Sequence, residues 1–149
     1  MNLVENVKWL PLTAVLVWNS ITDIKYRKIS VISMFILGIA GVAIAATGII
    51  TGQSFFQILK YVLLGSVPGL AMCILSLLSR GSLGMGDGIL ILMLGICTGI
   101  REISAILTWA FLLASVWAMG MLVIKKKNRY DSFPFVPFIT MGFFVNRIF

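Results

Sequence analysis

Three long stretches without a charged residue constrain this chain more than any other feature. They cover residues 29–59, 61–79 and 103–124. A helix needs roughly 20 apolar residues to cross a hydrocarbon core about 30 Å thick, and each stretch reaches about that length. Because 60% of the 149 residues are hydrophobic, a soluble domain of this size has too little interior to bury them. Lipid is therefore expected to cover much of the surface.

Continuous apolar runs favour helices over a membrane barrel, because barrel strands alternate apolar and polar residues over about ten positions. Three weaker segments, residues 9–22, 88–100 and 132–146, are short or contain Asn, Gly or Pro, and we interpret them as further spans. The sequence thus predicts an all-α, polytopic membrane protein with about six transmembrane helices. It predicts one integral-membrane domain over residues 1–149.

Basic residues gather in the loops on one side of these spans. The loops after the first, third and fifth helices hold most of them, including Lys25, Lys28 and the run 125–127. The positive-inside rule places these loops in the cytoplasm and both termini outside a cell (plasma or inner) membrane. We therefore attribute the net charge of +7 to topology and to contact with the lipid bilayer, not to nucleic-acid binding.

The chain has only five acidic residues, and two of them lie where an apolar segment meets water. Asp23 follows the first predicted span, and Asp87 precedes the fourth. The predicted topology brings both to the cytoplasmic face, although they are far apart in the sequence. Since an ionisable side chain near membrane depth is energetically costly, the pair predicts a functional site.

Two nearby carboxylates share one proton, because both cannot ionise cheaply. The ionised member can take a proton from water while the protonated member polarises a peptide carbonyl. This hydrolysis needs no metal and no cofactor. The chain has no histidine, which excludes Ser-His-Asp and Cys-His catalysis and disfavours a zinc protease. Cys73 and Cys97 form no CxxC pair, and we interpret them as packing residues.

The sequence leaves open which acid holds the proton. Asp87 begins a predicted helix, where the positive dipole end favours the ionised form, and Asp23 ends one. Helix dipoles alone therefore favour Asp87 as the base. The cations Lys25, Arg27 and Lys28 stand close to Asp23 in the chain and favour the opposite order.

Glycines surround Asp87 in the segment 84–88, which reads Gly-Met-Gly-Asp-Gly. Glycine permits positive φ and close backbone approach, so Gly84 and Gly86 are expected to let an extended substrate backbone lie beside Asp87. A flexible turn is the alternative. Lys28 is expected to attract substrate or anionic lipid in addition to setting topology. Asp131 follows a basic run and is interpreted as a solvated loop acid.

Three elements in this order resemble the type IV prepilin peptidases, aspartic peptidases of the GxGD class. They are residues 23–30 (Asp-Ile-Lys-Tyr-Arg-Lys-Ile-Ser), the GxGD motif 84–87, and residues 134–138 (Pro-Phe-Val-Pro-Phe). The resemblance implies cleavage of the short basic leader from prepilin-like proteins at the cytoplasmic membrane face. The cut lies just before the hydrophobic helix of the substrate, and Asp23 and Asp87 are the implied catalytic residues.

The chain departs from the family pattern at two positions: Ser30 stands where Pro is common, and Ile89 where Lys often follows GxGD. It also lacks the N-terminal extension with paired CxxC motifs that long bifunctional members carry. The resemblance is therefore to a short, peptidase-only form without methyltransferase activity, like those serving Flp-type pili or archaeal surface filaments. Presenilins and signal peptide peptidases share GxGD, but they are longer and place their first Asp in a Tyr-Asp motif.

A small non-enzymatic membrane protein, such as a transporter subunit or a filament or secretion assembly factor, is the competing hypothesis. Asp23 is then an interfacial acid beside basic residues, and Asp87 supports a helix start. Replacing Asp87 by Asn separates the two hypotheses, because shape is preserved while acid–base chemistry is lost. The sequence names neither the substrate nor the oligomeric state.

Overall fold

The part of the chain that the structure describes is helical, as the sequence predicts. This structure is a computed structural model, and it describes residues 3–26, 29–50, 52–79, 84–124 and 134–148. Within these ranges it contains six helices and no strand. The helices are α1 (Leu3–Tyr26), α2 (Val31–Ile50), α3 (Phe55–Leu78), α4 (Met85–Thr98), α5 (Ile100–Ile124) and α6 (Val136–Ile148).

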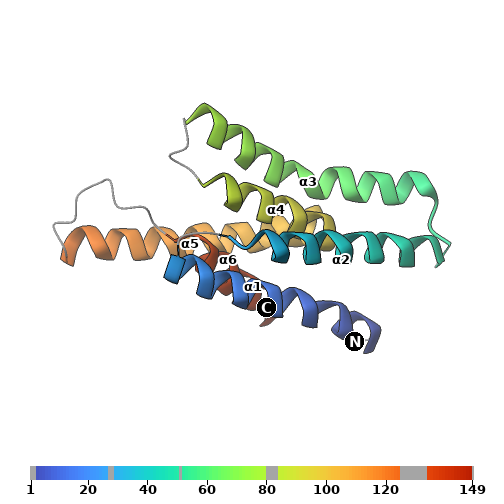
Figure 1. The fold of residues 1–149 in the computed structure, drawn as a ribbon, viewed down its shortest axis with the longest axis horizontal. Coiled ribbons are helices and arrows are strands. Elements are labelled where there is room, and N and C mark those ends of the chain that lie inside the picture. Colours follow the sequence, from blue (N-terminus) through green and yellow to red (C-terminus); the bar gives the residue numbers. More distant parts are fainter. Residues whose placement is uncertain (1–2, 27–28, 51, 80–83, 125–133, 149) are drawn as a thin grey trace.

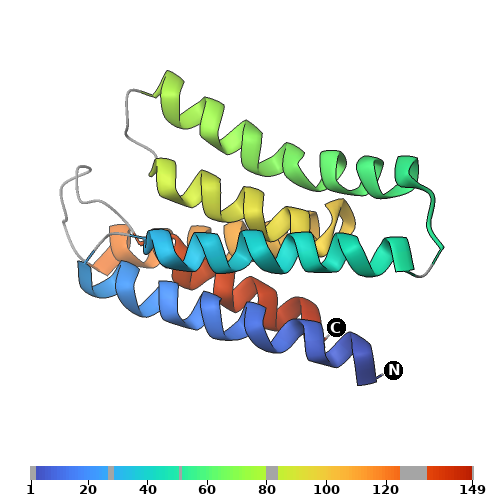
Figure 2. The same ribbon diagram turned by 45° about the vertical axis from the view of Figure 1, so that its right-hand side comes forward.

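The helices run alternately in opposite directions along one bundle (Figures 1 and 2). The odd-numbered helices run one way and the even-numbered helices run the other. As a result, the C-terminal end of α1 lies at the same end of the bundle as the N-terminal starts of α4 and α6. We call this the acid end, because Asp23 lies in the last turn of α1 and Asp87 in the first turn of α4. The opposite end is the far end.

Local chemistry explains the two turns at the far end. Gly52 adopts a φ of 80° after α2, and Ser54 then caps α3 by accepting from the Gln57 N–H at 3.3 Å. Between α4 and α5 the turn is a single residue, Gly99, with a φ of 82°. The predicted span 88–100 runs two residues past the end of α4 at Thr98. Its end was wrong because glycine at positive φ reverses the chain here.

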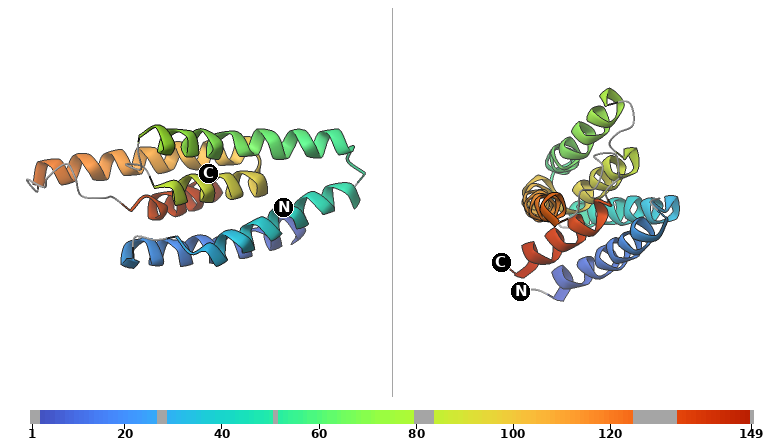
Figure 3. Two further views of the ribbon diagram at one scale, coloured as in Figure 1. Left: turned by 45° about the horizontal axis from the view of Figure 1, so that its top comes forward. Right: turned by 90° about the vertical axis from the view of Figure 1, so that its left-hand side faces the viewer.

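Helix α4 lies at the centre of the bundle, between α3, α2 and α5 (Figure 3). Its residues Leu90, Ile91 and Leu94 are completely buried. Helix α3 packs on α4 through small residues, with Gly65 against Gly95 and Gly69 against the backbone of Leu92. Small residues allow this close backbone approach between membrane helices. Helix α4, which carries Asp87, therefore has few side chains left for contact with lipid.

Large apolar side chains cover the outer surface. Ile32 of α2, Phe55 of α3 and Val116 of α5 are each more than 70% exposed. Three described helical segments are long and apolar enough to cross a membrane: Val31–Ile50, Phe55–Leu78 and Ile100–Met121. Helices α4 and α6 have only 14 and 13 residues. At about 1.5 Å per residue, each is roughly 20 Å long, shorter than a hydrocarbon core of about 30 Å.

Candidate active site

Asp23 lies at the acid end and is almost completely buried, with 7% of its surface exposed. Its Oδ2 accepts a hydrogen bond from the backbone N–H of Val136, at 3.2 Å. Val136 is the first residue of α6 and is itself fully buried. An acid from the first described helix is thus held by the backbone of the last one.

The N-terminal turn of α6 explains why this N–H is available. The Phe135 carbonyl accepts from the N–H groups of Phe138 and Ile139, at 3.0 and 3.3 Å. Pro137 has no N–H to donate. The first N–H groups of a helix have no partner within the helix. Val136 therefore presents the unused donor of this turn, and Asp23 accepts from it.

Buried polar residues on α1 fix the position of Asp23. Asn19 is one turn before it, is fully buried, and accepts from the Ser33 hydroxyl of α2 at 2.7 Å. Ser20 shares a hydrogen bond of 2.6 Å with Thr140 of α6. These contacts tie α1 to α2 and α6 on either side of the acid. The sequence patterns did not identify these positioning residues. The spacing of Asn19 and Asp23, four apart and therefore on one helical face, could have indicated that the two residues belong to one polar site.

Asp87 is the third residue of α4 and is partly buried. Its N–H donates to the Gly84 carbonyl at 3.1 Å, which starts the helix. A Cβ added to Gly84 would lie 2.9 Å from Oδ2 of Asp87. The carboxylate therefore folds back over Gly84, and any larger residue at position 84 must displace it.

The other two glycines of the motif make room for neighbouring segments. A Cβ on Gly86 would lie 3.1 Å from Cδ1 of Ile29, and one on Gly88 would lie 2.7 Å from Sγ of Cys73 in α3. Gly84 has a φ of −63°, and Gly86 and Gly88 are helical. These three glycines do not use the positive φ that glycine permits, because the helix already begins at Met85. The close approach that they permit here is to protein neighbours.

The two acids interact electrostatically at the acid end. Asp87 lies outside the three membrane-crossing segments and before the apolar part of α4. Burial, and then the negative charge of Asp23, raise the pKa of the Asp87 carboxyl from 3.8 to about 6. The helix N-terminus alone would lower this pKa, so burial outweighs the dipole. The structure thus brings the two acids to one end of the bundle, where the charge of Asp23 acts on Asp87.

The raised pKa of Asp87 predicts a pH-dependent gain in stability for Asp87→Asn. A carboxyl whose pKa is raised by folding favours the folded state when protonated, and this contribution is lost as pH rises from about 4 to about 6. Asn carries no charge and escapes the loss. We expect the apparent melting temperature of Asp87→Asn, measured in detergent, to exceed that of wild type at pH 7 by more than at pH 4. An equal difference at both pH values would contradict the shift.

Two other residues singled out in the sequence, Lys28 and Asp131, lie outside the described residues. Cys97 is buried and donates to the Leu37 carbonyl at 3.3 Å, in agreement with a packing role. Among the residues that the structure describes, no three His, Cys, Asp or Glu side chains gather as a metal site would require.

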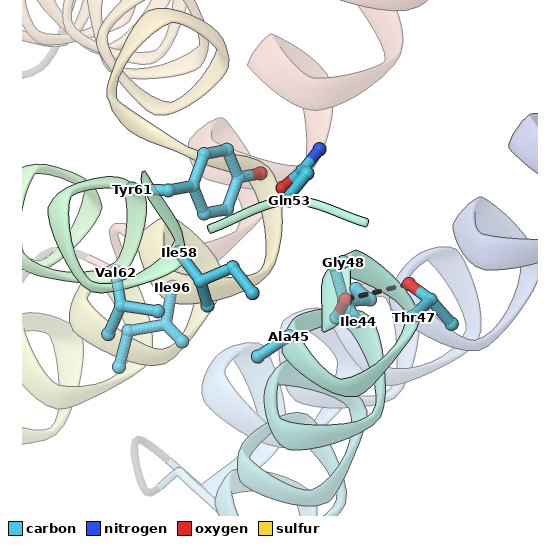
Figure 4. A pocket seen from close by; sticks show the side chains of 9 residues that line it. All are labelled: Ile44, Ala45, Thr47, Gly48, Gln53, Ile58, Tyr61, Val62 and Ile96. Carbon is cyan, nitrogen blue, oxygen red and sulfur yellow. Dashed lines mark hydrogen bonds between the residues drawn. The ribbon is translucent and has the colours of Figure 1, made fainter. Parts of the chain in front are cut away.

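Two cavities lie between the helices. One, of about 230 Å³, is at the far end between α2, α3 and α4; its lining, which includes Thr47, Gln53 and Tyr61, contains no acid (Figure 4). The other, of about 350 Å³, lies between α1 and α2. Its lining includes Trp18 and Ser33, which places it beside the helical turn that leads to Asp23. Neither Asp23 nor Asp87 lines either of these two cavities.

Comparison with known proteins identifies the family of this chain. The family model described as the type IV leader peptidase family matches residues 10–119. The match includes Asp23 and the motif 84–87, and it ends before Pro134. Searches of curated proteins and of solved structures found no significant match. Because the family model covers more than half of the sequence, this chain belongs to the type IV leader peptidase family.

Proposed function

We propose that this protein is a membrane aspartic endopeptidase that cleaves the leader peptide of prepilin-like substrates, with Asp23 and Asp87 as a water-activating pair. One observation carries the proposal: two acids from distant helices share one end of the bundle, and the charge of Asp23 acts on Asp87. Membership of the leader peptidase family supports peptide hydrolysis and substrates of this general kind.

The reaction follows from a pair that holds one proton. The ionised carboxylate takes a proton from water, and the resulting hydroxide attacks the scissile carbonyl carbon. The protonated carboxyl gives its proton to the carbonyl oxygen. Collapse of this tetrahedral intermediate breaks the C–N bond: the first carboxyl passes the proton it took from water to the leaving amine, and the second carboxylate takes a proton back from a hydroxyl of the intermediate. The reaction consumes one water and returns the pair to its starting state with one shared proton.

The membrane arrangement is part of the proposal. The acid end faces the cytoplasm of a plasma or inner membrane, and both termini lie outside. The basic residues in the loops after α1, α3 and α5 support this orientation. Because α4 and α6 are each shorter than the hydrocarbon core is thick, we place the acids at the membrane face, close to the point where a substrate helix enters lipid. Residues 1–149 form one peptidase domain.

The substrate contacts remain those expected from the sequence. Gly84 and Gly86 allow the extended substrate backbone to lie beside Asp87, and the position of the Asp87 carboxylate over Gly84 supports this use of the first glycine. Lys28 contacts the substrate or anionic lipid headgroups.

A cleavage assay tests the function and gives a further prediction. Membranes containing the protein are mixed with a candidate prepilin from the same genome, and mass spectrometry follows loss of the leader. We expect one cut just before the apolar segment, and we expect cleavage to persist in a metal chelator because carboxylates alone move the protons. Asp131→Asn should retain wild-type activity. Chelator-sensitive cleavage, or complete loss in stably expressed Asp131→Asn, would contradict this choice of catalytic pair.

A further inference from the structure

The contact between Asp23 and α6 favours one protonation state. The Val136 N–H donates to Oδ2 of Asp23 in a buried setting, and it does so at the positive end of the α6 dipole. A hydrogen bond to the charged form of a carboxylate stabilises that form. The dipole of α1 disfavours a negative charge on Asp23. Helix α6 opposes this effect, because its first N–H contacts the carboxylate directly.

Among the residues that the structure describes, the charged groups on the helices packed against Asp23 do not reverse this preference. Helix α2 has no charged residue, and the only one in α6, Arg147, lies in its last turn at the other end of that helix. On α1 itself, Lys25 is exposed and close in sequence, and its positive charge favours an ionised neighbour. Asp87 disfavours it only when Asp87 is itself ionised, and burial raises the pKa of the Asp87 carboxyl.

We propose that the backbone N–H of Val136 is a positioning group that keeps Asp23 ionised, so that Asp23 is the base and Asp87 the acid. This rests on the proposed function. Asp23 takes the proton from the attacking water, and Asp87 gives the shared proton to the scissile carbonyl oxygen. The order is the reverse of the one that the dipoles of α1 and α4 alone favour. The Pro-Phe-Val-Pro-Phe segment thereby acts on the catalytic step through its backbone.

Val136→Pro removes the donor with little change of shape. Proline is favoured at the first position of a helix, and its ring is similar in size to the buried valine side chain. Val136→Ala is the matched control, because it trims the side chain but keeps the N–H. The measured quantity is kcat/KM for leader cleavage from pH 4 to pH 9. The two limbs of this profile report the two ionisations of the free enzyme's acid pair.

We expect Val136→Pro to move the acidic limb upward by about one to two pH units, because a hydrogen bond to a charged group has that strength. The basic limb should stay in place, and Val136→Ala should keep both limbs. A shift of the basic limb would instead make Asp23 the proton-holding member and overturn the assignment. No shift of either limb in folded Val136→Pro would overturn the role of the N–H. Cleavage by wild type and Val136→Ala tests the function separately, since it does not depend on which limb moves.

A second measurement does not depend on the folding of Val136→Pro. The chain has three aspartates, so labelling aspartate at its side-chain carboxyl carbon with ¹³C gives three resonances. Asn variants at positions 23, 87 and 131 assign them. We expect the Asp23 resonance to titrate at lower pH than the Asp87 resonance in wild type. The same order should hold when each acid titrates without the other. The Asp23 resonance in Asp87→Asn should titrate at lower pH than the Asp87 resonance in Asp23→Asn. The opposite order in both comparisons would overturn the proposal.

Discussion

Asp87→Asn lowers kcat/KM for leader cleavage by about a thousandfold or more if the acid pair performs the reaction. The amide has the size of the carboxyl but neither takes nor gives a proton at neutral pH. Helix packing is preserved, because Asp87 is only partly buried and the motif glycines next to it are unchanged. Asp23→Asn should reduce cleavage to a similar degree. A quantitative assay with purified protein, in which leader release is followed by mass spectrometry, measures both.

Folding is the control for this loss. Asp87→Asn is expected to be at least as stable as wild type at pH 7, because it removes a carboxyl that is costly to ionise in place. Lost activity therefore cannot be ascribed to unfolding. A variant that keeps a tenth or more of wild-type kcat/KM would remove Asp87 from the mechanism and favour a non-enzymatic assembly role.

Gly95→Ala is expected to have the largest effect on folding. Gly95 faces Gly65 across the α3–α4 interface, and a Cβ on either residue would overlap the backbone carbonyl oxygen of the other. Backbone atoms cannot move aside as the end of a side chain can, so the two helices must separate. Overpacking of this kind lowers the free energy of unfolding by about 3 kcal/mol or more. Since stability margins are about 5–15 kcal/mol, much of the protein should fail to fold or to survive detergent.

Gly120→Ala is the matched control, because it places the same methyl group on a helical glycine in α5 with no atom within 4 Å. Alanine in place of a helical glycine stabilises by about 0.5–1 kcal/mol, so this variant should equal or exceed wild type. Apparent melting temperature and monodispersity in detergent measure both variants. Equal stability of Gly95→Ala and Gly120→Ala would mean that α3 and α4 do not approach as closely as the structure shows.

Apolar patterning was sufficient to predict the helices of this fold but not their lengths. Charge-free runs of about 20 residues require lipid or burial, so α2, α3 and α5 followed directly. The ends of α4 and α6 could not be predicted from the apolar pattern, because local backbone chemistry sets them. Gly99 ends α4 by adopting positive φ, and the Phe135 carbonyl starts α6. The central place of α4 also needed the structure, since it depends on glycine contacts with α3.

The two acids were predictable because an ionisable residue beside an apolar run is rare, and topology placed both on one face. Their surroundings were not. The Val136 N–H is a backbone group, and no side-chain pattern reveals which backbone donor lacks a partner. Nothing in the sequence distinguishes Ser20, Ser33 and Thr140 from other small residues of the helices. Their hydrogen bonds follow only from how the helices pack. The effect of each motif glycine on its neighbours likewise depends on which segment lies opposite.

The bond between Asp23 and Val136 joins residues 113 positions apart. During synthesis, Asp23 enters the membrane long before α6 leaves the ribosome, and until then the acid has no α6 backbone to accept from. The Ser20–Thr140 contact also waits for α6. A nascent chain that already contains both aspartates therefore lacks the backbone donor on which the proposed ionisation of Asp23 depends. We expect leader cleavage to require insertion of the last helix.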